Sequence, residues 1–475
     1  MMRSLSAALI LVVLACDPAL AAENAHHGAP HFDATSLGLI WAVPFVGILL
    51  SIAIFPLAAP SFWHHHFGKI SALWALLFLA PFTLQYGFDV ALYEVVHTAF
   101  LEYIPFIILL LSLYTVAGGV RLRGRLSGTP ATNTGMLALG TLAASFMGTT
   151  GAAMLFIRPM LDANDWRHYR VHTFVFFIFL VANIGGSLTP LGDPPLFLGF
   201  LKGVNFFWTT THMFLPLLVI AGALLLIYYL LDSLVHRKEP GHSPKVEQEE
   251  PLSLGGSINL LLLLGVVGGV LLSGLWKSGI TFEIYHVPIK LQNVARDLIL
   301  LALAGLSLVV TDREHRRANA FTWFPIIEVA KLFAGIFITI IPAIAILRAG
   351  TDGALAPVVS MVFDAEGNPN QPMFFWLTGI LSGFLDNAPT YLVFFNTAGG
   401  DAQELMGPMA DTLLAISCGA VFMGAMTYIG NAPNFMVRSI CEERGLPMPS
   451  FFGFVLWSAV FLVPLYLLLT WLFFM

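Results

Sequence analysis

The chain has 475 residues, of which 57% are hydrophobic and 11% are charged, and its formal net charge is −6. Soluble proteins carry about 25% charged residues, so this composition excludes a soluble globular protein. It predicts an all-α polytopic membrane protein. Three cysteines are scattered along the chain, a pattern that predicts neither a disulfide framework nor a metal cluster.

Residues 1–22 have the pattern of a signal peptide. Arg3 precedes an apolar stretch at 7–15, and the small residues at 19–22 resemble a cleavage site. Cleavage leaves an exported tail at 23–35. This predicts a bacterial-type inner membrane protein whose mature N-terminus lies outside the cytoplasm.

Apolar runs of about 20 residues predict the membrane helices of the first half, 36–235. Three helices, a re-entrant hairpin, a broken helix and a closing helix are expected at 36–59, 70–87, 92–120, 134–161, 171–200 and 212–235. The small and polar stretch at 147–153 divides the hairpin into two apolar arms of about a dozen residues, each too short to span a bilayer.

A polar linker at 236–252 precedes a second half, 253–475, with the same plan. Its three helices, hairpin, broken helix and closing helix are expected at 254–276, 293–311, 323–348, 372–397, 411–440 and 451–474. The chain is therefore expected to have about 10 transmembrane helices plus two hairpins.

The positive charges test this topology. With the N-terminus outside, 15 of the 22 Lys and Arg residues fall in predicted cytoplasmic loops, including a loop that holds Lys69 and the linker. This agrees with the positive-inside rule. Because each half has five crossing helices, the halves are predicted to be inverted repeats.

Both predicted broken helices are interrupted by glycine, proline and polar residues. In the first, at 183–195, Asp193 lies in the break, and in the second, at 427–436, Asn431 occupies the corresponding position. Irregular backbone and a charge at membrane depth persist where they line a cavity or a site. Matching interruptions in two halves point to a transporter's binding site.

The two breaks and the two hairpin tips contain the candidate ion-binding residues. These are Thr149, Thr150, Asn183, Ser187, Thr189, Asp193, Asp386, Asn387, Thr390, Thr427, Asn431 and Asn434. Their oxygens suit a hard cation such as Na⁺, which we expect at Asp193, Asp386, Asn387 and Asn431.

A carboxylate that exchanges a proton for that cation would perform antiport. Two other roles stay open: Asn431 and Thr427 are also suited to hydrogen bonds between helices, and Asp386 to capping a hairpin helix.

Three charged residues lie in predicted scaffold helices. Glu102 and Glu328 precede the hairpins, and Lys331 is three residues beyond Glu328 on the same helix face. They are candidates for a proton relay or an ion pair. No phosphate loop, nucleophile elbow, zinc spacing or haem motif is present in the sequence. An enzyme is therefore not expected, with an intramembrane enzyme as the distant alternative, and Na⁺ and H⁺ as coupling ions are the expected ligands.

The motifs at 185–195 and 385–390 resemble the signatures of the ion transporter superfamily, in particular NhaD-type sodium/proton antiporters and citrate transporters. The resemblance covers nearly the whole chain. It implies a scaffold and a mobile transport domain that moves in an elevator fashion, usually in a homodimer. The chain departs from the dicarboxylate carriers, because its first hairpin tip, 148–151, has no Asn, and from NhaD-type chains, because that tip lacks Asp-Asn.

The sequence therefore predicts a secondary active transporter, with Na⁺/H⁺ antiport as the preferred function. A Na⁺- or H⁺-coupled citrate or dicarboxylate transporter is the alternative. The expected partners are membrane lipid, a second copy of the chain, and a small ion or carboxylate, but no nucleic acid.

Overall fold

The computed structural model describes residues 30–124, 126–240, 253–364 and 366–475. The predicted signal peptide, most of the predicted exported tail and most of the linker at 236–252 lie outside the described residues. The rest of the chain folds into helices joined by short turns, as the composition predicts.

The first half contains the predicted order of elements. Its helices are α2 (Val43–Ala58), α3 (Pro60–Tyr86), α4 (Phe88–Thr98), α5 (Ile104–Ala117), α6 (Pro130–Met147), α7 (Thr149–Ala163), α8 (Val171–Leu180), α9 (Pro194–Leu201) and α10 (Phe206–His236). A π-helical turn, η3 (Ala99–Tyr103), joins α4 to α5 in one continuous rod. The hairpin is α6–α7, and the broken helix is α8–α9.

The second half repeats this order. Its helices are α11 (Ile258–Leu275), α12 (Leu291–Val310), α13 (Arg313–Ala318), α14 (Phe324–Arg348), α15 (Ala356–Val362), α16 (Gln371–Phe384), α17 (Asn387–Thr397), α18 (Ala402–Met406), α19 (Ala410–Met423), α20 (Ala432–Glu443), α21 (Phe451–Phe461) and α22 (Val463–Phe473). The second hairpin is α16–α17, and the second broken helix is α19–α20.

Seven of the described helices are long and apolar enough to cross a membrane, or eight if the bent pair α21–α22 is one span. The prediction of about ten is larger because it counts the two broken helices as spans, although each is interrupted before it reaches spanning length. The chain is thus an all-α multi-pass membrane protein.

The helix predicted at 70–87 is longer than expected. It begins at Pro60, immediately after α2, and Lys69 lies inside it. The predicted cytoplasmic loop around Lys69 is therefore wrong. Proline is well tolerated in the first turn of a helix, where its missing N–H has no helical partner, so Pro60 starts α3.

Two short antiparallel pairs of strands were not predicted. β1 (Arg121–Arg123) pairs with β2 (Ser253–Gly255), and β3 (Thr281–Ile284) pairs with β4 (Val287–Lys290). In the second pair, Tyr285 and His286 form a two-residue turn, both with positive φ. Two consecutive residues with positive φ give the turn the twist that two-residue β-hairpins require.

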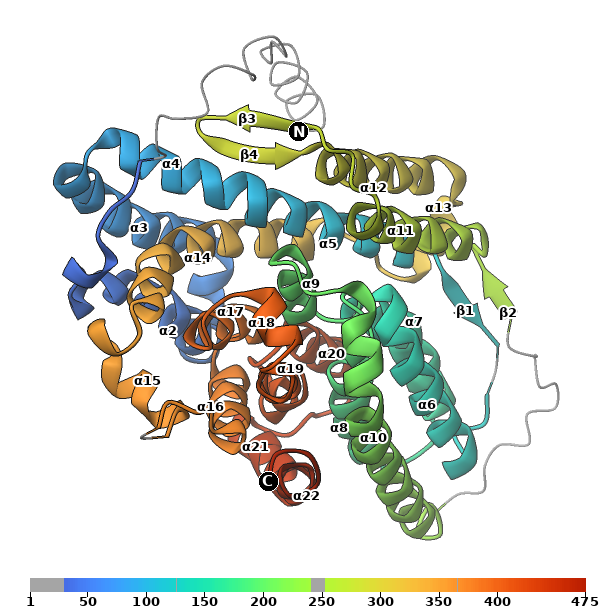
Figure 1. Cartoon of the computed structure of the whole chain (residues 1–475). Helices are drawn as coiled ribbons and strands as arrows, with labels where there is room; N and C mark the ends of the chain where they lie inside the picture. Colours follow the sequence, from blue (N-terminus) through green and yellow to red (C-terminus); the bar gives the residue numbers. More distant parts are fainter. Residues whose placement is uncertain (1–29, 125, 241–252, 365) are drawn as a thin grey trace.

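The helices form two parts. The scaffold is α2–α5 and α11–α14, and the hairpin bundle is α6–α10 and α16–α22 (Figure 1). The scaffold halves use the same packing: α5 lies against α11 and α12, and α14 lies against α2 and α3. Helix α9 packs against α17 and α19, and it also contacts η3 in the long α4–α5 rod (Figure 1).

The opposite membrane orientation of the two halves stays a prediction, and cysteine labelling tests it. Asp165 follows the first hairpin and Asn368 precedes the second, and both are exposed. With Cys418 and Cys441 buried, background labelling should be low. A membrane-impermeant thiol reagent should label Asp165→Cys from the cytoplasmic side only, and Asn368→Cys from the outer side only. Labelling of both from one side would contradict inverted repeats.

Candidate functional site

The two helix breaks have closely similar local structure. Asp193 is the residue before α9 and Asn431 is the residue before α20, and both have extended backbone. These two positions are 238 residues apart. Each following helix has proline in its first turn, which fixes the start of the helix after the break.

A threonine ties each break to the neighbouring hairpin. Thr189 Oγ1 donates to Ser145 O at 2.5 Å and accepts from Leu191 N. At the same offset of 238 residues, Thr427 Oγ1 donates to Gly383 O at 2.5 Å and accepts from Ile429 N. Both threonines, predicted as ion ligands, have their hydroxyls engaged in these structural hydrogen bonds.

The breaks also require a close approach of two backbone segments. A Cβ at Gly192 would lie 2.1 Å from Gly186 O, and a Cβ at Gly430 would lie 2.5 Å from Gly424 O. Such distances are far below van der Waals contact, so glycine is needed for this loop in both halves.

Asp193 lies where both breaks and both hairpin tips meet. Its carboxylate accepts hydrogen bonds from Thr149 Oγ1 at 3.1 Å, Asn431 Nδ2 at 2.9 Å and Asn387 Nδ2 at 2.5 Å. The residue is 1% exposed. The three donors come from the first hairpin, the second break and the second hairpin, so one carboxylate joins all the elements of the predicted site.

Four helices begin at this carboxylate. Thr149 and Asn387 are the first residues of α7 and α17, and Asp193 and Asn431 immediately precede α9 and α20. Helix N-termini carry partial positive charge, and these converge on one negatively charged group. All three side-chain donors are neutral, and within the described residues no ion pair involves Asp193.

Asn183 and Asn434 form a second buried contact between the two breaks. Asn183 Nδ2 donates to Asn434 Oδ1 at 2.6 Å, and Asn434 Nδ2 donates to Gly424 O and Thr427 O. Two buried oxygens, Asn183 Oδ1 and Ser187 Oγ, have no hydrogen-bond partner among the described residues. A buried polar atom without a partner is costly, so these oxygens are available for a cation or water.

Asp386 has the capping role that the sequence left open, and its place in the ion site stays a prediction. Its Oδ1 accepts from Ala388 N at 3.0 Å, so it caps α17. Thr390 Oγ1 donates to Asp386 O within the same turn. The neighbouring residue, Asn387, is the one that reaches Asp193. Thr150 is half-buried, and no hydrogen bond brings it to the carboxylate in the described part of the chain.

The charged scaffold residues do not pair as helical spacing suggests. Lys331 lies over the ring of Phe67, and no ion pair joins it to Glu328 in the described structure. Glu102 instead pairs with Lys202, at 2.5 Å. Lys202 was not among the predicted residues, although a lysine directly after the apolar α9 is an unusual feature at the end of a broken helix.

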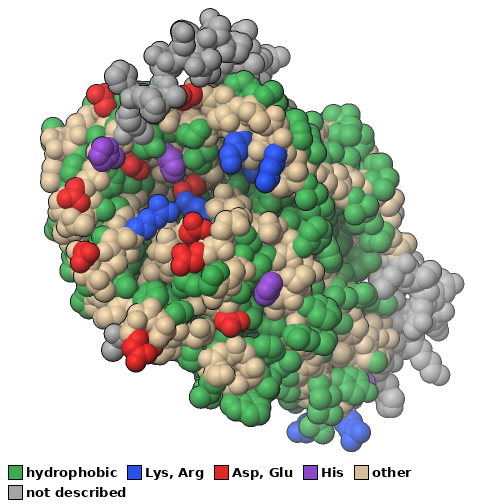
Figure 2. Space-filling model, viewed as in Figure 1, with side chains coloured by type: hydrophobic (Ala, Val, Ile, Leu, Met, Phe, Trp, Pro, Cys, Tyr) green, Lys and Arg blue, Asp and Glu red, His purple; other side chains and the backbone are tan. Residues whose placement is uncertain are grey.

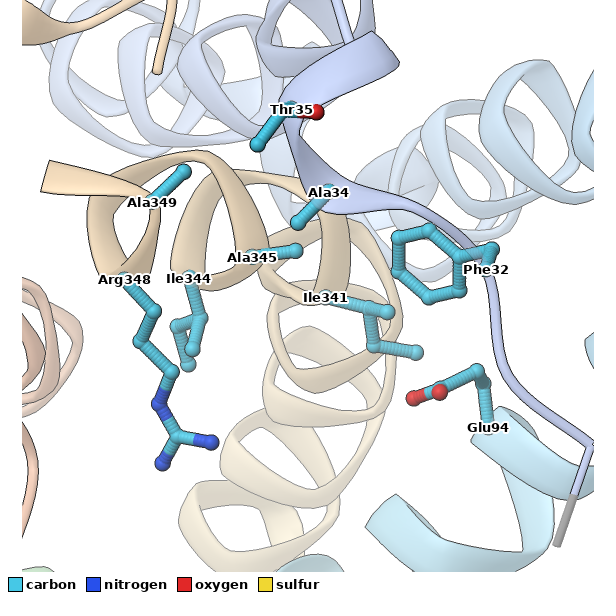
Figure 3. A pocket seen from close by; sticks show the side chains of 9 residues that line it. All are labelled: Phe32, Ala34, Thr35, Glu94, Ile341, Ile344, Ala345, Arg348 and Ala349. Atoms are coloured by element: carbon cyan, nitrogen blue, oxygen red, sulfur yellow. The ribbon is translucent and has the colours of Figure 1, made fainter. Parts of the chain in front are cut away.

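A polar cavity of about 350 Å³ separates scaffold and hairpin bundle beside this ion pair. Among the residues that line it are Glu94, His97, Glu102, Lys202 and Arg348. An adjoining cavity of about 360 Å³ lies under the N-terminal segment, with Glu94 on one side of α14 and Arg348 on the other (Figure 3). Figure 2 shows acidic and basic side chains gathered near the middle of this face, among hydrophobic ones.

Apolar spans, two hairpins and paired helix breaks together define a multi-pass membrane transporter. A family model described as putative citrate transport matches residues 34–474, so the chain belongs to that family. It is also similar to uncharacterized transporters from Mycobacterium bovis and Mycobacterium tuberculosis. Each is 24% identical over 330 residues, which cover 68% of this chain and 72% of the relative.

The threonine ties give a stability prediction. Thr189→Val and Thr427→Val each leave a buried carbonyl without its donor, so each should lower the free energy of unfolding by about 1–3 kcal/mol. Thr134→Val is the control, because its hydroxyl bonds Pro130 O within its own helix, and it should cost less than about 0.5 kcal/mol. The thermal unfolding midpoint of the purified protein measures the difference. Equal midpoints for all three variants would contradict the structural role.

Proposed function

We propose that the protein is a Na⁺/H⁺ antiporter, and the surroundings of Asp193 carry this proposal. A buried carboxylate with neutral hydrogen-bond partners has no fixed counter-charge. Hydrogen bonds and helix N-termini offset the cost of burying this charge only in part, so a proton or a bound cation is favoured at that position. Competition of the two for one carboxylate is the elementary step of antiport.

The helix N-termini support a cation exchanger over an anion carrier at this point. Four N-termini would favour an anionic substrate if the space between them were empty. Here the carboxylate of Asp193 already occupies that position. A second anion would be repelled, whereas Na⁺ would be attracted.

The first break also contains two side-chain oxygens that could bind Na⁺. Asn183 Oδ1 and Ser187 Oγ are buried and unpartnered in the described structure, and neutral oxygens of this kind suit Na⁺. We propose that they complete the coordination that Asp193 begins. Asn387 and Asn431 hold the carboxylate in place, since their amide nitrogens donate to it.

Alternating access follows from the two-part architecture. The polar cavity opens beside the N-terminal segment, at the end of α14 that carries Arg348. At the opposite end of α14, Tyr114, Met154 and Ile326 form an apolar cluster that joins scaffold and bundle. We propose that the bundle slides along the scaffold in an elevator motion, and that this arrangement is open on the cavity side.

Carboxylate transport coupled to Na⁺ or H⁺ is the second candidate. It is favoured by the family description and by two cationic side chains, Lys202 and Arg348, that line the polar cavity of about 350 Å³. In this case a citrate-like anion would bind in the cavity and Asp193 would carry the coupling ion.

Asp193→Asn tests the preferred function. The amide is nearly the same size and still accepts hydrogen bonds, but it holds neither charge nor an exchangeable proton. Exchange in proteoliposomes, followed by a pH-sensitive dye inside and a ²²Na⁺ tracer, should fall to the level of protein-free vesicles. Exchange at the wild-type rate in this variant would contradict antiport at Asp193.

Asp386→Asn is the matched control, because Asn also caps helices and the change again removes one carboxylate charge, here a half-buried one. It should weaken the apparent Na⁺ affinity without abolishing exchange, since Asp386 is next to the site but caps α17. Citrate uptake is measured in the same vesicles. Citrate-dependent transport, with no Na⁺/H⁺ exchange in its absence, would favour the second candidate.

A further inference from the structure

The contact between scaffold and hairpin bundle is polar at one end and apolar at the other. Among the described residues, two polar side-chain contacts join the parts near the polar cavity of about 350 Å³: Lys202 Nζ to Glu102 Oε1 at 2.5 Å, and Arg348 Nε to Asn396 Oδ1 at 2.8 Å. Of the ion pairs among the described residues, the Glu102–Lys202 pair is the one that crosses between the parts. The opposite end of the contact is the apolar cluster around Met154.

The local backbone also singles out Glu102. It lies in the π-helical turn η3, where the rod formed by α4 and α5 departs from regular helix. Turns of this kind occur often at functional sites because they re-aim a side chain. Here the turn carries the carboxylate that pairs with Lys202, the residue directly after α9, and Asp193 is the residue directly before α9.

The ion pair borders a cavity large enough for a hydrated ion. The side chains of Lys202 and Glu102 are 17% and 9% exposed, so the pair is partly shielded from bulk water. The other charged or titratable groups lining the same cavity are Glu94 and His97 on α4 and Arg348 on α14. Lys202 Nζ therefore occupies the position that a solution cation would take beside a carboxylate.

We propose that Glu102 is an outer binding site for a monovalent cation, where the cation replaces Lys202 Nζ and releases the hairpin bundle from the scaffold. In the described part of the chain, loss of the ion pair leaves the Arg348–Asn396 hydrogen bond as the polar side-chain contact between the parts at this end. The apolar surfaces can slide without breaking a polar contact. The identity of the cation as Na⁺ rests on the proposed function. The release of the hairpin bundle by a monovalent cation does not depend on that function.

Labelling of a buried cysteine measures the release directly. Met154→Cys, in a background with Cys16, Cys418 and Cys441 replaced by Ala, places a thiol in the apolar cluster, where Met154 is 6% exposed. The full chain in lipid nanodiscs is treated with a water-soluble maleimide, with Na⁺ replacing choline at constant ionic strength. We expect Na⁺ to raise the labelling rate of this reporter.

Variants of the pair define the result. Glu102→Gln and Lys202→Gln should each raise the rate about fivefold, the factor expected for loss of a partly shielded ion pair, and should remove the response to Na⁺. Lys69→Gln, the same chemical change at an exposed position on α3, should leave the labelling rate and its response to Na⁺ unchanged. If the Met154→Cys reporter is labelled at the same rate in Glu102→Gln and Lys202→Gln as in the parent, the proposal is overturned.

A charge-reversed double variant guards against misfolding of the single ones. Glu102→Lys combined with Lys202→Glu re-forms the ion pair, so the slow labelling rate should return. If the double variant is labelled as fast as the single variants, the ion pair is not the cause of slow labelling and the proposal is overturned.

Asp193→Asn separates this proposal from the proposed function. Retention of the Na⁺ response in that variant supports a cation site at Glu102, and its loss overturns that site while leaving antiport at Asp193 standing. A chain that responds to Na⁺ in labelling but exchanges no Na⁺ in proteoliposomes would overturn the proposed function alone.

Discussion

Burial of one carboxylate sets the requirements that the rest of the bundle meets. Asp193 is almost completely buried, and its oxygens receive hydrogen bonds from two hairpins and from the opposite helix break. Each donor comes from the start of a helix, where backbone N–H groups lack helical partners. The helix breaks, the glycine contact and the proline-initiated helices all serve to bring these helix starts together at one depth.

The two halves share backbone structure but differ in chemistry at this point. The offset of 238 residues that relates Asp193 to Asn431 also relates Thr149 to Asn387, and Thr189 to Thr427. At the same offset, Gly148 with positive φ corresponds to Asp386 with extended backbone. One half thus supplies the carboxylate that both breaks share, and the other half supplies two amides that donate hydrogen bonds to it.

Much of this arrangement is predictable from the sequence because its signals are local. Runs of apolar residues, the glycine and proline interruptions and the two hairpin tips indicate the elements and their order. Contacts between remote segments are not local. The sequence placed both Asp386 and Asn387 at the site, but it did not indicate that Asn387 is the one that contacts Asp193, or that Glu102 pairs with Lys202. The first ten residues of α3, up to Lys69, were missed because polar residues in a helix give a weak pattern. The strand pairs were missed because strands of three or four residues also give weak patterns.

Proton release on Na⁺ binding tests the central claim most directly. Purified protein in weakly buffered solution, with a pH indicator, is titrated with NaCl and, separately, with choline chloride. If Na⁺ replaces a proton on Asp193, Na⁺ should release protons in a saturable manner, choline should release none, and Asp193→Asn should show no release. Saturable Na⁺ binding without proton release, or undiminished release in Asp193→Asn, would contradict exchange at this carboxylate.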